Sequence, residues 1–183
     1  MLNYEKIFAL KAIKKDYKEL SSEPIPNIKY TLGLTDEDNI FEWKLIFIGP
    51  KNTPYEGGQF LVKIKFQENY PSKGPIAHFI TPIYHPDVNK RKSNNELLGF
   101  IPIPSIMWWS PNKSTIKEVI SQINELFFNA TCEHPYGIDM ANEYREKKEL
   151  FGKKAKYFTE KYANPIKNNN VDEDKVWDFS YQE

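Results

Sequence analysis

Residues 84–111 read YHPDVNKRKSNNELLGFIPIPSIMWWSP. This stretch opens with a His-Pro turn and closes with Trp-Ser-Pro, directly ahead of a segment with helical periodicity, and it contains no cysteine. Two turn-forming runs precede it, PYEGG at 54–58 and YPSKGP at 70–75. Proline and glycine at such positions separate regular elements, so we expect strands between these turns.

The composition fits one globular domain. The chain has 183 residues, 40% hydrophobic and 15% aromatic, which is within the roughly 100–200 residues of a single domain. Lys+Arg and Asp+Glu both number 25, so no overall charge attracts the chain to nucleic acid or to an anionic membrane. No apolar run approaches the ~20 residues of a membrane helix. We expect protein partners, no nucleic acid binding and no membrane insertion.

The single cysteine, Cys132, excludes an internal disulfide and suits a reducing compartment. The first residues lack a secretory signal pattern. We therefore expect a cytoplasmic or nuclear protein.

Helical periodicity marks three segments. In the first, about 4–20, apolar residues repeat every three or four positions: Leu10, Ile13, Tyr17 and Leu20. The second follows Pro111, where Thr115 and Glu118 have the spacing of a capping box. The third spans about 138–162, and any break in it is expected near Gly152.

Between the first two helices lie four strand-like segments: 28–34, 41–47 and 60–66, which alternate apolar with polar residues, and a shorter run at 76–80. This period of two predicts strands with one buried face, and the short connections imply an antiparallel meander. We expect an α+β fold with an N-terminal helix, a four-stranded antiparallel meander sheet, a buried central helix and a C-terminal helix.

The folded domain is predicted to cover residues 1–164, followed by a polar, acidic tail over 165–183. Trp177, Phe179 and Tyr181 stand at alternating positions in this tail. Two interpretations stay open: an unstructured end with scattered aromatics, or a strand-like segment that docks on a partner or on its own domain. Trp177 is the candidate contact residue.

Taken in order, the motifs resemble those of the ubiquitin-conjugating enzyme family. Four segments carry the resemblance: GPKNTPYEGGQF at 49–60, YPSKGP at 70–75, YHPDVN at 84–89 and EKYA at 160–163. They resemble, respectively, the family's turn between the second and third strands, its Tyr-Pro-x-x-Pro-Pro loop, its His-Pro-Asn turn and a common ending. The resemblance implies the family's fold from about residue 4 to 163.

The resemblance also implies a catalytic cysteine between the His-Pro turn and Trp-Ser-Pro. Depending on the alignment, its position falls on Ile101 or Pro102, and neither side chain can form a thioester. The asparagine of the family's turn is Asp87 here, whose carboxylate has the wrong charge for an oxyanion. We interpret His85 as structural and expect no conjugating activity.

His134 is a further residue of this vestigial site, and Cys132 lies near it in the sequence. Aligning Pro135 with a family proline places His134 beside the former active site, and Cys132 lies two residues earlier. An ordinary cysteine is the favoured interpretation, and a displaced nucleophile is the alternative. We expect neither a cofactor nor a metal, because four ligands at a recognisable spacing are absent from the sequence.

The surfaces that the family uses for partners are only partly retained. The first helix docks on the activating enzyme in the family, so Lys11 and Lys14 mark either such a surface or a solvated helix face. RING-type ligases grip an aromatic residue in the Tyr-Pro loop, where this chain has Ser72, followed by Lys73. The other half of that surface is present: Trp109, Ser110 and Pro111. Since few anchors dominate an interface, we expect weakened ligase binding.

Three functions are compatible with these features. The first is a non-catalytic ubiquitin-conjugating-enzyme-like protein, a binding or regulatory module for a conjugating enzyme, ubiquitin or a ubiquitin-like protein. The second is a scaffold subunit of a larger assembly, with the insertion at 90–98 and the tail as contacts. The third is an active enzyme that uses Cys132.

Overall fold

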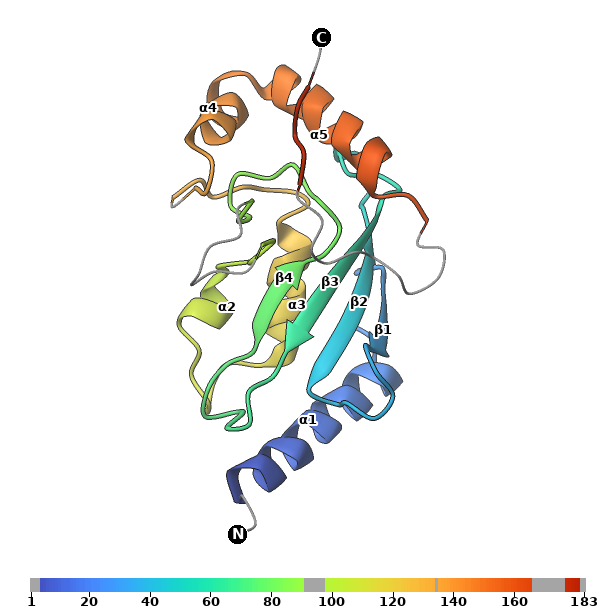
Figure 1. The fold of residues 1–183 in the computed structure, drawn as a ribbon, viewed down its shortest axis with the longest axis vertical. Coiled ribbons are helices and arrows are strands. Elements are labelled where there is room, and N and C mark those ends of the chain that lie inside the picture. The colour runs from blue at the N-terminus through green and yellow to red at the C-terminus, as the bar shows by residue number, and fades with distance from the viewer. Residues whose placement is uncertain (1–3, 91–97, 134, 166–176, 182–183) are drawn as a thin grey trace.

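The computed structural model describes residues 4–90, 98–133, 135–165 and 177–181 (Figure 1). Its centre is a four-stranded antiparallel sheet in the order β1-β2-β3-β4, which confirms the predicted meander. The strands are β1 Tyr30–Leu34, β2 Glu42–Ile48, β3 Gln59–Lys65 and β4 Ile76–Phe79.

The alternation in β2 and β3 sets which sheet face is buried. Trp43 pairs with Ile64, Leu45 with Val62 and Phe47 with Phe60, and all six side chains are fully buried. The residues between those of β2 are only partly buried. A period of two therefore directs one face of the sheet into the core.

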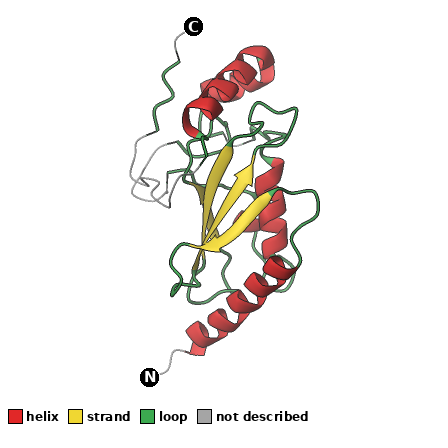
Figure 2. Cartoon of the chain, turned by 90° about the vertical axis from the view of Figure 1, so that its right-hand side faces the viewer, coloured by secondary structure: helices red, strands yellow, loops and turns green. Residues whose placement is uncertain are grey.

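The described helices are α1 Tyr4–Ser22, α2 Pro104–Met107, α3 Ile116–Glu125, α4 Ile138–Glu146 and α5 Lys148–Tyr162. Helix α3 lies along one side of the sheet, whereas α1 and the α4–α5 pair lie at opposite ends of it (Figures 1 and 2). The predicted capping box begins α3: Thr115 accepts from the Glu118 amide, and the Glu118 carboxylate accepts from the Thr115 amide.

Two details of the helices differ from the sequence prediction. The third helical segment breaks at Lys147, whose backbone lies outside the helical region, and Gly152 continues within α5. The short helix α2 was not predicted. The sequence feature that marks its start is Pro104 at the first helical position, where the backbone N–H that proline lacks would have no partner within the helix.

The core is rich in aromatic rings. Phe127, just after α3, packs against rings from three strands and from the 54–58 turn: Phe47, Phe60, Phe79 and Tyr55. These contacts fix α3 on the sheet and so position the loop that follows it.

Candidate functional site at the His-Pro turn

His85 lies buried in the turn. Its side chain is buried, and its Nδ1 accepts a hydrogen bond from the Asp87 amide at 3.2 Å. The buried hydroxyl of Tyr55 donates to the preceding carbonyl, that of Tyr84, at 2.9 Å. The first bond stabilises the turn itself, and the second ties the turn to the core.

Burial lowers the pKa of His85 to about 4, below its usual value of 6.5. The unfolded chain therefore takes up a proton between these pH values that the folded chain does not. We expect the free energy of unfolding to fall by on the order of 3 kcal/mol between pH 7 and pH 4. Denaturant titrations at several pH values measure this slope.

The control for this prediction is His85→Asn, whose amide oxygen can still accept from the Asp87 amide. Its stability should depend less on pH over the same interval. An identical slope in the variant and the wild-type chain would assign the effect to other groups.

Asp87 ties the turn to the loop after α3. Its carboxylate accepts from the Thr131 amide at 2.6 Å, from the Thr131 hydroxyl at 3.2 Å and from the Cys132 amide at 3.0 Å. The residue is buried. Asp87 thus accepts hydrogen bonds from three donors. The sequence, in which Asp87 was compared with the asparagine of the family's turn, did not predict this role.

Cys132 follows in this loop with a backbone φ of 52°. Its side chain is buried, and burial, assisted by the Asp87 charge, raises the pKa of the thiol. The guanidinium of Arg145 donates to the Cys132 carbonyl and only partly offsets this effect. A buried, protonated thiol is a poor nucleophile. His134, the predicted neighbour, lies outside the described residues.

The two candidate positions for a family cysteine differ in exposure. Ile101 is fully buried, and its amide donates to the Ala77 carbonyl at 3.1 Å. Pro102 is half-buried and lines a pocket of about 340 Å³ with, among others, Asp87, Ile103, Pro104, Leu126 and Tyr136. Trp108 and Met107 also line it and remain 76% and 54% exposed. The pocket beside these two positions is therefore largely apolar and carries an exposed tryptophan.

The Tyr-Pro loop and Trp-Ser-Pro meet as the sequence predicted. The Trp109 indole N–H donates to the Pro71 carbonyl at 2.7 Å, and its ring lies 5.6 Å from that of Tyr70. A Cβ at Gly74 would lie 2.7 Å from the same indole, so glycine is needed for this close approach. Ser72 and Lys73 beside it are exposed, as is Pro111, whereas Ser110 is half-buried.

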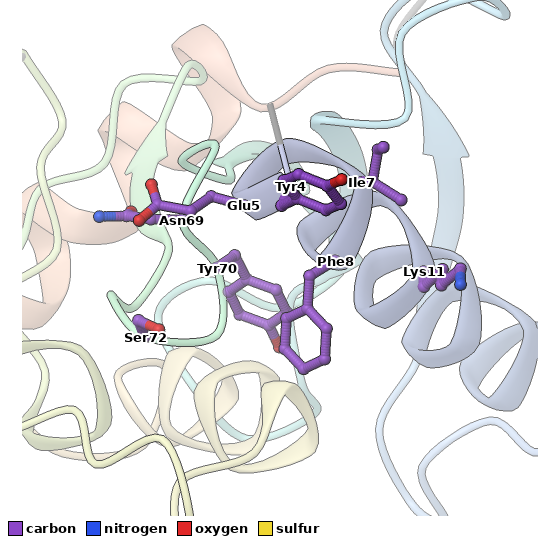
Figure 3. Close-up of a pocket in the computed structure, with 8 residues that line it drawn as sticks. All are labelled: Tyr4, Glu5, Ile7, Phe8, Lys11, Asn69, Tyr70 and Ser72. Atoms are coloured by element: carbon purple, nitrogen blue, oxygen red, sulfur yellow. The ribbon is translucent and has the colours of Figure 1, made fainter. Parts of the chain in front are cut away.

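A second pocket, of about 460 Å³, lies between α1 and this loop (Figure 3). Phe8 and Lys11 from α1 line it together with Tyr70 and Ser72. Tyr4 and Phe8 are 82% and 62% exposed. The sequence did not predict them as surface residues of interest, because they lie outside the apolar stripe of the first helix. Lys11 and Lys14 are exposed, so the helix face beside the pocket is basic and aromatic.

Comparisons with known proteins agree with this architecture. A family model described as ubiquitin-conjugating enzyme matches residues 12–159. The chain belongs to the ubiquitin-conjugating enzyme family. The match spans the His-Pro turn, the apolar pocket and Trp-Ser-Pro, so this member of the family has Ile101 and Pro102 at the positions considered above.

Individual members of the ubiquitin-conjugating enzyme family align with most of this chain. Ubiquitin-conjugating enzyme E2 13 of Arabidopsis thaliana is 31% identical over 151 residues, 78% of this chain and 88% of its own length. Human ubiquitin-conjugating enzyme E2 T is 30% identical over 166 residues, 91% of this chain and 80% of its own. The crystal structure of a putative ubiquitin conjugating enzyme from Plasmodium yoelii superposes with a TM-score of 0.71 at 29% identity, covering 86% and 97% of the two chains.

Two kinds of feature are absent from the described residues. No described helix has the length and apolar character needed to cross a membrane. Within the same residues, no three His, Cys, Asp or Glu side chains are grouped as metal binding would require.

Proposed function

We propose that this member of the ubiquitin-conjugating enzyme family is non-catalytic and acts as a protein-binding module in ubiquitin or ubiquitin-like modification. The observation that carries the proposal is the replacement of the expected cysteine. Ile101 is a fully buried core residue, and its backbone amide donates a hydrogen bond to the Ala77 carbonyl in β4. Pro102 has no nucleophilic atom. Acyl transfer through a thioester requires a thiolate, and residues 84–111 supply none.

The properties of Cys132 also support a non-catalytic role. Its thiol is buried and its pKa is raised, whereas a reactive cysteine is exposed and has a lowered pKa. The carboxylate of Asp87 next to it further disfavours a thiolate. The loop geometry thus favours a structural cysteine over a displaced nucleophile.

Exposed aromatic residues support binding. The exposed Trp108 beside the apolar pocket, and Tyr4 and Phe8 beside the second pocket, are large apolar side chains in contact with solvent. Aromatic residues of this kind dominate protein interfaces. The proposed partners are a conjugating enzyme, ubiquitin or a ubiquitin-like protein.

A loading assay tests the absence of catalysis. The full chain is incubated with activating enzyme, ATP and ubiquitin or each of several ubiquitin-like proteins, beside an active family member as positive control. We expect no thiol-labile adduct on the wild-type chain or on Cys132→Ser. An adduct on the wild-type chain that thiols remove, and that Cys132→Ser lacks, would show an active enzyme instead.

Binding is measured separately by titrating the full chain with purified ubiquitin, ubiquitin-like proteins and conjugating enzymes. Saturable binding to one of these is expected. If none binds and the chain co-purifies from native extract in fixed stoichiometry with one complex, a scaffold subunit replaces the proposed module.

A further inference from the structure

The end of the chain lies against α5 (Figure 1). Residues 177–181, WDFSY, alternate in burial: Trp177, Phe179 and Tyr181 are buried or half-buried, whereas Asp178 and Ser180 are exposed. This alternation is that of an extended segment with one face on a surface. Of the two interpretations left open by the sequence, the described residues therefore show a segment docked on its own domain.

The surface beneath this segment is a row of aromatic rings. The Phe179 ring lies 5.0 Å from that of Phe158, nearly perpendicular to it, and 5.6 Å from that of Tyr84. The Tyr181 ring lies 5.4 Å from that of Tyr157. Edge-to-face pairs of this kind add to the free energy of apolar burial. Because Tyr84 belongs to the His-Pro turn, the row joins α5 to the centre of the domain.

Polar contacts accompany the ring contacts of the segment. The Asp178 carboxylate lies 3.4 Å from the Lys161 ammonium, and the Asp178 carbonyl accepts from the Tyr162 hydroxyl. The Lys154 ammonium lies over the Tyr181 ring at 5.7 Å. In the docked segment an acidic residue thus stands between two aromatic ones, with a third aromatic residue two positions after the second.

We propose that the aromatic face of α5 and Tyr84 form a peptide-binding site for extended segments with alternating aromatic residues and an acidic residue between them. The chain's own residues 177–181 occupy this site, so that a partner segment of the same pattern binds only by displacing them. The proposal does not depend on the proposed function above, because the contacts that carry it involve neither Ile101, Pro102 nor Cys132.

The covalent link to α5 makes the occupancy a competition. When two parts of one chain are joined by a short linker, each has an effective concentration for the other on the order of 1 mM. A free peptide with a Kd of ~10–100 µM for the open site would then bind the full chain about 10- to 100-fold more weakly.

The test uses full chains and a labelled peptide of residues 175–183, KVWDFSYQE. The open variant carries Trp177→Ala and Phe179→Ala, which remove side chains of the docked segment and leave α5 unchanged. Its matched control is Ser180→Ala, on the exposed face of the same segment. A control peptide of the same composition exchanges the order of the residues that correspond to Asp178 and Phe179, which turns the phenylalanine to the opposite face.

Fluorescence anisotropy measures each Kd. We expect the open variant to bind the native peptide at least tenfold more tightly than the wild-type chain and Ser180→Ala do, and to bind the exchanged peptide at least tenfold more weakly. Equal affinity of the open and wild-type chains, no binding to the open variant at millimolar peptide, or equal affinity for the two peptides would each overturn the proposal.

Discussion

Replacing Phe127 by alanine is expected to lower the free energy of unfolding by about 3–5 kcal/mol. The ring is 1% exposed, and its centroid lies 5.1 Å from that of Phe60 and 5.7 Å from that of Tyr55. Removing it leaves a cavity. The surrounding rings cannot move to fill this cavity, because they belong to several elements and each ring is held in place by the backbone of its own element. For a chain of this size the melting temperature should fall by roughly 6–20 °C.

The neighbouring residue supplies the control. Phe128 has the same side chain and is 48% exposed, so Phe128→Ala should cost about 1 kcal/mol or less. Both variants are measured by denaturant titration at pH 7. Equal losses would mean that the ring contacts around Phe127 do not carry the stability assigned to them.

The sequence was sufficient for the sheet and for α3 because their signals are local. Strand alternation predicted the meander, and the Thr115–Glu118 spacing predicted the start of α3. Helix α2 was missed because four residues are too few for a helical period. The break at Lys147 has no proline or glycine to mark it, and Gly152 was the wrong place because glycine is tolerated inside a helix at a modest cost.

The site was predicted less completely than the fold because its contacts are distant in the chain. The sequence singled out His85 and Ile101 as site residues, and both are buried in the structure. It did not predict that Asp87 would bind amides 44 and 45 residues away. The spacing of the tail aromatics indicated a docked segment as one interpretation, but the surface formed by Tyr84 and Phe158 exists only in the folded chain.

Restoring the family's asparagine at Asp87 is expected to destabilise this protein. Two carboxylate oxygens accept from the amides of Thr131 and Cys132. In Asp87→Asn one of these oxygens becomes an NH₂ donor that faces an N–H, which leaves a buried donor unpaired and removes a charge-assisted bond. We expect a loss of about 2–4 kcal/mol in the free energy of unfolding, although the variant is closer to the family's sequence.

A local measurement separates this effect from general unfolding. Because Cys132 is the only cysteine and is buried in the loop that Asp87 holds, the rate at which a thiol reagent labels it in native buffer reports on opening of that loop. Labelling should be at least about tenfold faster in Asp87→Asn, since each 1.4 kcal/mol lost locally is a factor of ten in the open population.

The matched control is Glu133→Gln, the same chemical change at an exposed position of the same loop, which should alter neither stability nor labelling by more than a small amount. If Asp87→Asn and Glu133→Gln behave alike, the carboxylate at 87 is not what closes the loop. If Asp87→Asn alone labels rapidly, the carboxylate at 87 holds this loop closed through its bonds to the backbone amides of Thr131 and Cys132.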